Sequence, residues 1–420
     1  MDFQQVVSIF GTAMMVGVGW LLCRKKKQIN WKPVVWGVVL QFVFAVIVLR
    51  TAPGRWFFAS MNDVIIKLLS FQQEGAQFLF GPLGISPGSP GSMGFFFAFQ
   101  VLTTIIFFSS LMSVLYYLGV MQKIVLLFAV VMKRFLGTSG AESLSASANI
   151  FVGQTEAPLL IKPYIEDMTE SELFCIMVGG MATVAGGVMA AYVGMLQPYF
   201  PDIAGHLLAA SVMSAPAALA LAKVIMPETG TPKTSGTIKL AYKDPSINVI
   251  DAASNGAAAG LSLALNVGTM LIAFMSLLAL ANFLFGSVLG LAGFPGFTIE
   301  RVLGYILSPL AWVMGVPWKD CFAIGQLMGV KTVLNEFVAY AQLGEILKAN
   351  PKALDYRSIV IATYALCGFS NFLSIGIQIG GIGPLAPSRR GDLAKLGIRA
   401  LIGGTLASFM TATIAGILVP

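Results

Sequence analysis

Hydrophobic residues along this chain gather in long continuous runs, unlike the spaced stripe that marks the buried face of a soluble helix. The first run, FQQVVSIFGTAMMVGVGWLLC at 3–23, reaches the roughly 20 residues that a helix needs to cross a bilayer. Such runs predict eight transmembrane helices, at 3–23, 34–49, 93–119, 172–197, 203–226, 255–289, 354–385 and 395–419. The expected fold class is therefore an all-α polytopic membrane protein.

Two further segments, 141–165 and 320–347, are long enough to cross a bilayer but are polar in their middle. A re-entrant hairpin accounts for both, because two half-helices of about 10 residues rise about 15 Å, half of the hydrocarbon core. Irregular backbone at that depth is tolerated only where protein buries it or where it lines a water-filled cavity. We therefore expect two re-entrant helical hairpins in addition to the eight spans.

The two polar segments follow the same order of elements, which indicates an internal repeat. Each comes after a short interfacial helix that ends in glycine, at Gly137 and Gly315, and precedes a glycine-interrupted span and a final span. The interval is 19 positions from Gly137 to Glu156 and 21 from Gly315 to Glu336. The predicted topology admits the two hairpins from opposite sides, so the repeat is inverted. Inverted repeats with broken helices are typical of secondary transporters, whose binding site lies near the midplane.

Composition agrees with this fold, and charge adds an orientation. Of the 420 residues, 57% are hydrophobic and 11% are charged, a balance that a soluble domain cannot accommodate. The net charge of +7 comes from Lys and Arg in short loops, so it indicates topology within a lipid bilayer and not a nucleic-acid partner. The basic clusters at 24–32, 123–162, 233–243 and 389–399 fall on one side, which the positive-inside rule makes cytoplasmic, and both termini then face outward.

The remaining segments connect these elements. KIVLLFAVVMKRFLG at 123–137 is short and bracketed by positive charge, which predicts a helix lying in the membrane interface. We interpret residues 51–92 as an external helix followed by a loop, and residues 227–254 as a polar cytoplasmic loop. The four cysteines lack the spacing of a disulfide framework or metal site, so we expect a structural role for all of them.

Two acidic residues, Glu156 and Glu336, lie inside the predicted hairpins. A carboxylate at membrane depth is a functional candidate, because leaving it unpaired is energetically costly. The structural alternative is an ion pair, for which Lys331, five residues before Glu336, is the available partner. The carboxylates therefore indicate a polar site unless an ion pair neutralises them.

The neighbouring residues suggest what such a site would bind. Thr155 or Asn335 would cap the second half-helix of its hairpin and expose backbone N–H groups at the midplane. Gln154 adds an amide beside Thr155. Two facing tips with such donors and acceptors suit a neutral, polyhydroxylated ligand.

The interrupted spans offer further candidates. Asn371 and Ser374 are three positions apart and so share a helix face, and Phe369 offers a ring for stacking on a planar ligand. Asn149 and Thr183 supply hard oxygen atoms. The backbone carbonyls of Val152 and Val184 would complete oxygen ligation of a small cation, as half-helix ends do for sodium in broken-helix transporters.

Three motifs, in this order, resemble those of concentrative nucleoside transporters. They are GQTEAPLLI at 153–161, GVKTVLNEFVA at 329–339 and FSNFLS at 369–374. The resemblance covers nearly the whole chain, and the chain is similar in length to bacterial members of that family.

The resemblance implies roles for individual residues. Gln154, Thr155, Glu156 and Val188 would face the nucleobase. Glu336, Asn371 and Ser374 would hold the ribose, and Phe369 would pack on the nucleoside. The sodium ion (Na+) would fall on Asn149 and Thr183, the latter often serine in the family, with the carbonyls of Val152 and Val184.

The resemblance also implies an assembly. We expect a homotrimer in the bacterial inner membrane that imports uridine or a similar nucleoside by an elevator motion. Residues 1–120 and 255–295 would form the scaffold, and residues 121–226 and 296–420 the two repeats of the transport domain.

Other functions remain open at this point. Proton coupling is the alternative within the family, whose proton-coupled members tend to lack the asparagine seen at Asn149. A passive channel or a receptor could share the fold. An intramembrane hydrolase is disfavoured, because no aspartate is deeply embedded and the one histidine, His206, is expected at the surface or interface at a span end.

Overall fold

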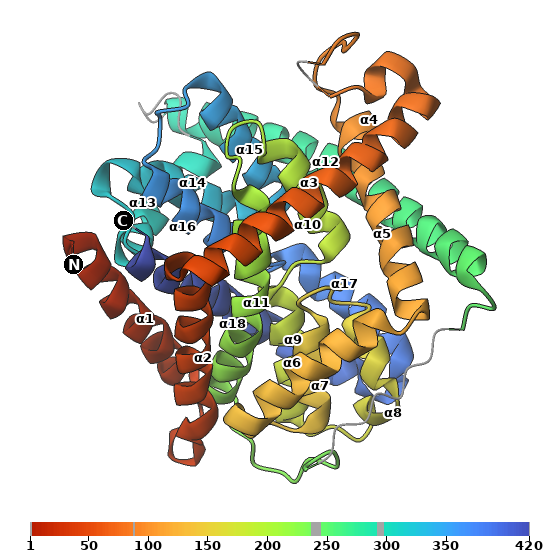
Figure 1. Ribbon diagram of the computed structural model, residues 1–420. Coiled ribbons are helices and arrows are strands. Elements are labelled where there is room, and N and C mark those ends of the chain that lie inside the picture. Colours follow the sequence, from red (N-terminus) through yellow and green to blue (C-terminus); the bar gives the residue numbers. More distant parts are fainter. Residues whose placement is uncertain (1, 87–88, 237–244, 292–297, 420) are drawn as a thin grey trace.

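The computed structural model of this chain describes residues 2–86, 89–236, 245–291 and 298–419, which form helices joined by loops (Figure 1). No strand occurs among these residues, so the all-α prediction is confirmed. The first half contains α1 (Phe3–Leu22), α2 (Trp31–Arg50), α3 (Ala52–Phe80), α4 (Phe97–Gln100), α5 (Leu102–Tyr117), α6 (Val120–Leu136), α7 (Gly140–Ala148), α8 (Lys162–Ile165), α9 (Glu170–Ala182), α10 (Gly186–Leu196) and α11 (Ile203–Ile225). The second half contains α12 (Val249–Leu291), α13 (Ile299–Val313), α14 (Trp318–Val333), α15 (Glu336–Ala349), α16 (Tyr356–Leu366), α17 (Phe372–Ile382) and α18 (Arg390–Leu418).

Seven segments of the described chain are long and apolar enough to cross a membrane. They are Phe3–Leu22, Trp31–Arg50, Phe97–Tyr117, Glu170–Leu196, Ile203–Ile225, Val249–Val288 and Pro387–Leu418. All seven correspond to predicted spans. The eighth predicted span, 354–385, is divided into α16 and α17, each of 11 residues, so it crosses only as a broken pair.

The two re-entrant hairpins enter from opposite ends of the molecule (Figure 1). The helices before them end at Gly137 and Gly315, whose φ angles of 72° and 95° are accessible to glycine and strained for other residues. Helix α14 then turns back at 119° to α13. Both interfacial helices, their terminal glycines and the inverted hairpins thus follow the predicted order.

The first hairpin differs from the prediction in its return limb. In place of a half-helix of about 10 residues, the chain forms a 3-10 turn at Ala157–Ile161 and the four-residue α8. Pro158 and Pro163 account for this, because each removes a backbone N–H that a continuous helix would require. No side chain caps the 3-10 turn, so the capping role predicted for Thr155 is wrong.

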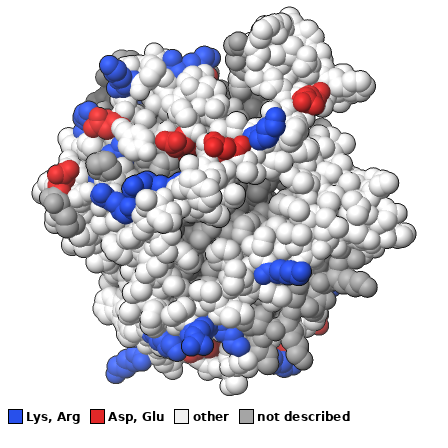
Figure 2. Space-filling model, viewed as in Figure 1, with Lys and Arg blue, Asp and Glu red and all other residues white. Residues whose placement is uncertain are grey.

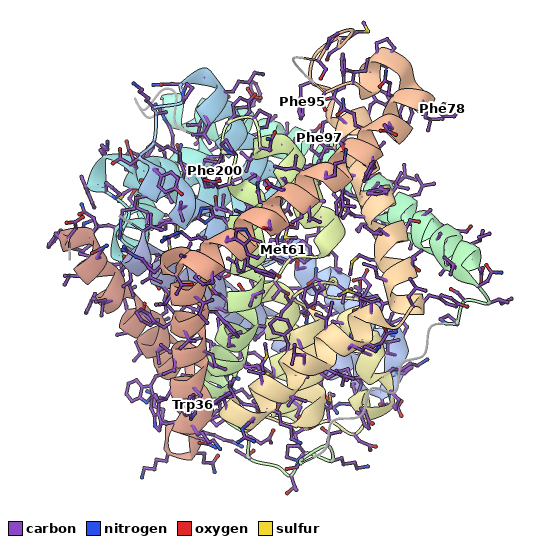
Figure 3. The ribbon with its side chains drawn as sticks, viewed as in Figure 1. Trp36, Met61, Phe78, Phe95, Phe97 and Phe200 are labelled. Atoms are coloured by element: carbon purple, nitrogen blue, oxygen red, sulfur yellow. The ribbon has the colours of Figure 1, made fainter. Side chains whose placement is uncertain are left out.

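The helix predicted within residues 51–92 is present as α3, and part of the polar loop predicted at 227–254 is present. Helix α3 runs obliquely across the molecule, and Phe78 and Phe95 lie at its protruding end in Figure 3. The loop predicted at 227–254 is shorter, since α12 begins at Val249, where the Asn248 side chain accepts the Asp251 N–H at 2.9 Å. Lys239 and Lys243, part of the third basic cluster, lie outside the described residues.

Charged side chains gather at the two ends of the molecule in Figure 2 and leave a largely uncharged band between them. Lys and Arg dominate the lower end, which contains the α1–α2 loop, whereas the upper end carries both signs. This distribution agrees with the predicted orientation, in which the lower end is cytoplasmic.

Two pairs of spans pack closely together. Helices α5 and α12 meet at Gly256 and Gly260, where a Cβ on Gly260 would lie 2.8 Å from the Ile106 Cα. Helix α2 meets α11 at Gly37, where a Cβ would lie 2.6 Å from the Ala220 Cβ. Small residues therefore allow the backbones to approach closely in both helix pairs, as is common between transmembrane helices.

Candidate functional site

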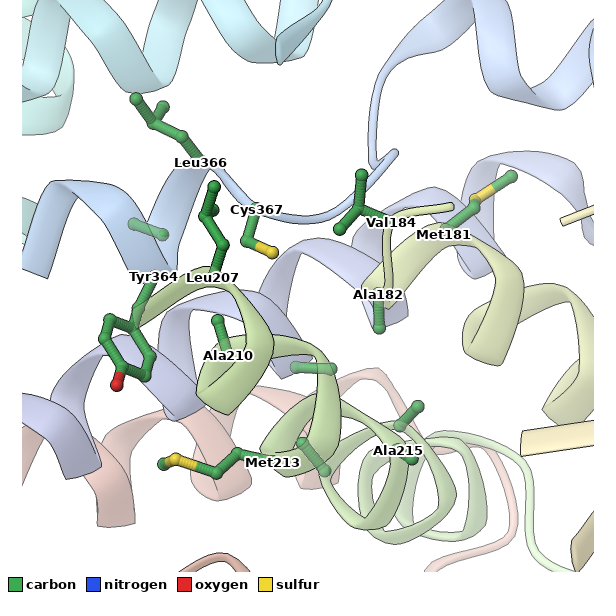
Figure 4. Packing of buried hydrophobic residues seen from close by; sticks show 14 of the residues in the cluster. Met181, Ala182, Val184, Leu207, Ala210, Met213, Ala215, Tyr364, Leu366 and Cys367 are labelled. Carbon is green, nitrogen blue, oxygen red and sulfur yellow. The ribbon is translucent and has the colours of Figure 1, made fainter. Parts of the chain in front are cut away.

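The two broken spans cross each other at their breaks. Helix α9 ends at Ala182 and α16 ends at Leu366, and Figure 4 shows the chain after Cys367 running toward Val184. The Phe369 N–H donates to the Thr183 carbonyl at 3.2 Å. A Cβ on Gly368 would lie 2.8 Å from each of the carbonyl oxygens of Met181 and Ala182, so this approach requires glycine.

The second hairpin brings Glu336 to this crossing. Its buried carboxylate accepts from the Tyr192 hydroxyl at 3.0 Å and from the Asn371 side-chain amide at 2.8 Å. Asn335 caps α15 by accepting the Val338 N–H at 3.0 Å, as predicted. The carboxylate is thus held by neutral donors that leave room on its oxygens for further donors.

The Lys331–Glu336 ion pair, considered above as the structural alternative, does not form. The Lys331 ammonium instead donates to the Ala365 carbonyl at 2.7 Å, and no described carboxylate forms an ion pair with it. Helix α14 brings this side chain to the last turn of α16, where the Ala365 carbonyl is its hydrogen-bond partner.

The first hairpin contacts the same crossing through Gln154. Its side-chain N–H donates to the Ser374 hydroxyl at 3.2 Å, while its carbonyl oxygen is buried without a partner. Ser374 in turn gives its backbone N–H to Asn371, which caps α17 at 2.9 Å. Polar side chains therefore run continuously from one hairpin tip to the other.

Asn149 is the best candidate among these residues for a cation ligand. Its side chain is 1% exposed, and neither its oxygen nor its nitrogen has a hydrogen-bond partner. It lies against Gly179, where an added Cβ would be 3.4 Å from its nitrogen, and the Thr183 hydroxyl donates to the Gly179 carbonyl at 2.9 Å. A buried amide without partners beside a helix C-terminus fits a small cation.

The ligand types agree with such a cation. No group of three or more His, Cys, Asp or Glu side chains that could hold a metal occurs in the described part of the chain. The oxygens at Asn149, Thr183, Val152 and Val184 are amide, hydroxyl and carbonyl oxygens, which suit a hard monovalent ion in broken-helix transporters.

A cavity of about 360 Å³ opens beside the first hairpin, between α5, α12 and the break of α9 and α10. Ligand pockets typically measure roughly 300–1,000 Å³. Glu156, the only exposed member of the proposed base-contacting residues, lines it together with Ser109 and Asn255. Of the other predicted site residues, Val152 lines this cavity and the rest do not.

The first hairpin is anchored at its entry by a buried ion pair that the sequence did not indicate. Lys223 of α11 pairs with Glu142 of α7 and, at 3.4 Å, with Glu228. Partial burial raises the pKa of Glu228, but the Lys223 ammonium and the Gly230 N–H lower it further, so it stays below its ordinary value. The entry to the hairpin is therefore fixed while its tip carries the unpartnered groups.

Sequence reasoning missed two residues of the site, Tyr192 and Gln378. Gln378 is buried and donates to the Met177 carbonyl at 2.9 Å, and a Cβ on Gly180 would lie 2.7 Å from its amide nitrogen and from the Gln154 Cβ. Each is a polar residue inside an apolar run, which was the available signal. Val188 is buried on α10, and Phe369 is half-buried beside the crossing.

His206 is buried, which corrects the prediction of a surface or interfacial residue. Its ring stacks on Phe200 at 5.2 Å and lies 3.4 Å from the hydroxyls of Tyr356 and Tyr364. Aromatic neighbours from α16 cover the start of α11, and their distance in sequence hid this contact. All four cysteines are buried and free, in agreement with a structural role.

Family models match three consecutive parts of the chain. Residues 10–83 match the model described as Na+ dependent nucleoside transporter N-terminus, and residues 206–416 match Na+ dependent nucleoside transporter C-terminus. Residues 98–199 match the model described as Nucleoside recognition.

Relatives and solved structures are similar over nearly the whole chain. It is 44% identical to Solute carrier family 28 member 3 of Eptatretus stoutii over 99% of this chain, although it spans only 60% of that protein. It is 44% identical to an uncharacterized transporter of Haemophilus influenzae, covering 98% of this chain and 97% of that protein. The structure of CNTnw in an inward-facing substrate-bound state superposes with a TM-score of 0.92 at 42% identity, covering 99% of this chain and 98% of that one.

These matches agree with the three motifs and with the crossed, broken helices. The chain belongs to the Na+ dependent, or concentrative, nucleoside transporter family.

Proposed function

We propose that this protein is a secondary active symporter that imports nucleosides, uridine or a similar one, across the bacterial inner membrane with the sodium gradient. The observation that carries the proposal is the continuous set of polar side chains between the two hairpin tips, Glu336–Asn371–Ser374–Gln154, with the unpartnered Asn149 amide nearby. Family membership supports it.

The proposed ribose contacts follow from the second hairpin. Glu336 accepts hydrogen bonds from sugar hydroxyls, while Asn371 and Ser374 supply a donor and an acceptor beside it. Tyr192 orients the carboxylate through its hydroxyl, which donates at 3.0 Å. Phe369, half-buried at the crossing, packs against the nucleoside.

The proposed base contacts come from the first hairpin. Gln154 has a free carbonyl oxygen that accepts from a base N–H, and Thr155 lies beside it. Glu156 faces the cavity between the hairpin and α5, and Val188 provides an apolar wall. Because Gln154, Thr155 and Glu156 lie on the short loop that follows Asn149, a base bound there also orders that loop.

Sodium, when bound by Asn149, Thr183 and the carbonyls of Val152 and Val184, supplies the positive charge that the membrane potential acts on. A charge moving down 100 mV yields about 2.3 kcal/mol, and a tenfold concentration gradient adds about 1.4 kcal/mol. The sum of about 3.7 kcal/mol supports accumulation of several hundredfold. Ion binding that orders the first hairpin tip would favour nucleoside binding, and by linkage the nucleoside would favour the ion.

For the transport step we propose an elevator motion in which residues 121–226 and 296–420 slide against a scaffold of residues 1–120 and 255–295, within a homotrimer. The α5–α12 pair flanks α10 and the cavity, a position that suits the stationary scaffold against which α10 would move. Helices α1 and α2 pack closely on α18 and α11, so a motion that leaves them behind must break those contacts.

Sodium should drive uptake of labelled uridine into proteoliposomes. An inward sodium gradient should stimulate uptake strongly compared with choline, and Asn149→Ala should abolish most of the stimulation because the buried amide oxygen is lost. Asn350→Ala, at the exposed end of α15, should behave like the wild type. Uptake that is the same in choline, or driven only by a proton gradient, would rule out sodium coupling.

Glu336→Gln should weaken uridine binding by about 5- to 150-fold, because an amide N–H₂ replaces an acceptor and sugar hydroxyls lose a partner worth about 1–3 kcal/mol. Isothermal titration measures the affinity for uridine and for its 2′-deoxy and 3′-deoxy analogues. The variant should discriminate among these less than the wild type does. Glu345→Gln, exposed on the same helix, serves as the matched control. Wild-type affinity of Glu336→Gln for every analogue would show that this carboxylate does not hold the ribose.

A disulfide between the proposed scaffold and transport domain should stop transport. A Cβ on Gly187 of α10 would lie 3.6 Å from the Ser109 hydroxyl oxygen of α5, close enough for a disulfide after Ser109→Cys and Gly187→Cys. Oxidation should block uptake reversibly while uridine binding persists, and each single-cysteine variant should be unaffected. Full uptake by the cross-linked protein would contradict relative motion of α5 and α10.

A further inference from the structure

Lys331 is a buried lysine that forms no ion pair with a carboxylate in the described part of the chain. Its side chain is 0% exposed, and its ammonium lies 5.7 Å from the centre of the Phe409 ring. The hydrogen bond that it makes is to the Ala365 carbonyl, at 2.7 Å, in the last turn of α16. A lysine this deeply buried requires compensation, and here a helix C-terminus and an aromatic face provide it.

The Ala365 carbonyl is available because α16 is broken. In a continuous helix the Phe369 N–H would donate to this carbonyl, but it donates instead to Thr183 across the crossing. The Thr363 carbonyl, also in the last turn of α16, accepts a hydrogen bond from the Tyr340 hydroxyl of α15 at 2.6 Å. Both limbs of the second hairpin therefore satisfy carbonyls at the negative end of α16.

The first repeat handles the matching helix end differently. There the first hairpin reaches the last turn of α9 with Asn149, whose amide has no partner, and the Thr183 hydroxyl satisfies the Gly179 carbonyl. No lysine or arginine side chain among the described residues donates a hydrogen bond to the end of α9. One repeat thus has the Lys331 ammonium at its break, and the other has the Asn149 amide, which has no hydrogen-bond partner.

We propose that Lys331 acts as a built-in cation, taking in the second repeat the place that the mobile coupling ion takes in the first. Its ammonium holds the end of α16, from which the chain continues directly to Phe369 and Asn371. Lys331 is therefore a positioning residue for the ribose side of the site. Because the Lys331 ammonium holds the break after α16, a single mobile cation is enough to order the break after α9.

This inference rests on the proposed symport, and its test separates the two. Uridine affinity is measured by isothermal titration over a series of sodium concentrations for the wild type, Lys331→Met, Lys331→Ala and Lys331→Arg. Thr332→Ala, whose hydroxyl donates to Met328 on the same half-helix, is the control. If the uridine affinity of the wild type does not depend on sodium concentration, the proposal of sodium coupling fails. The uridine affinities of the Lys331 variants still test the role of Lys331.

Lys331→Met, which keeps the length but removes the charge, should weaken uridine binding about tenfold or more, whereas Lys331→Arg should bind within a few-fold of the wild type. Lys331→Ala leaves space for an added ion. Its uridine affinity should depend on about the second power of sodium concentration, against about the first power in the wild type, and ethylammonium should restore it. Thr332→Ala should keep the wild-type affinity and sodium dependence.

Equal uridine affinity in Lys331→Met and Lys331→Arg would overturn the proposal, as would a loss in folded Lys331→Ala that neither sodium nor ethylammonium restores. If Lys331→Ala does not fold, the comparison of the methionine and arginine variants decides. A merely structural lysine would lower thermal stability without changing the sodium dependence of binding.

Discussion

Backbone groups left unpaired at membrane depth are the constraint on which this structure depends. Each break ends one helix and starts another inside the protein, where no bilayer water can satisfy the freed carbonyl and N–H groups. The chain meets this requirement by crossing the breaks, so that Phe369 of one donates to Thr183 of the other. Ser408 of α18 adds a hydroxyl 3.5 Å from the Ala182 carbonyl. The site is therefore a consequence of how two broken helices are made compatible with a membrane.

The same constraint explains why both hairpins are required. Neither break can satisfy its groups alone, and each hairpin reaches one break from the opposite end of the molecule. The second hairpin completes its break with Lys331 and Tyr340, while the first leaves the Asn149 amide and the Gln154 oxygen without partners. Buried polar atoms without partners are costly, so the proposed ion and nucleoside would contribute most to stability there. We propose that binding of the two ligands is coupled, because one short loop holds both sets of atoms.

The sequence predicts those features that depend on local pattern. Apolar run length located seven spans, glycine marked the ends of both interfacial helices, and Asn335 before Glu336 indicated a helix start. Features that depend on which side chain a segment meets were not predictable. Tyr192 and Lys331 contact partners more than thirty positions away, and His206 is covered by a distant helix. Pro158 and Pro163 were a signal in the sequence that the return limb of the first hairpin is not a continuous helix. The symmetry of the repeat nevertheless favoured the prediction of a half-helix there.

The most direct test of this account is hydrogen–deuterium exchange of the backbone amides around the two breaks, measured with sodium alone and then with sodium and uridine. If the unpaired groups at the crossing are completed by ligands, sodium alone should slow exchange at 149–153 and 183–187. Uridine should then extend the protection to 154–156 and 369–374. Exchange at these segments that is unaffected by either ligand, while both bind, would contradict the claim that the crossed breaks form one ligand-completed site.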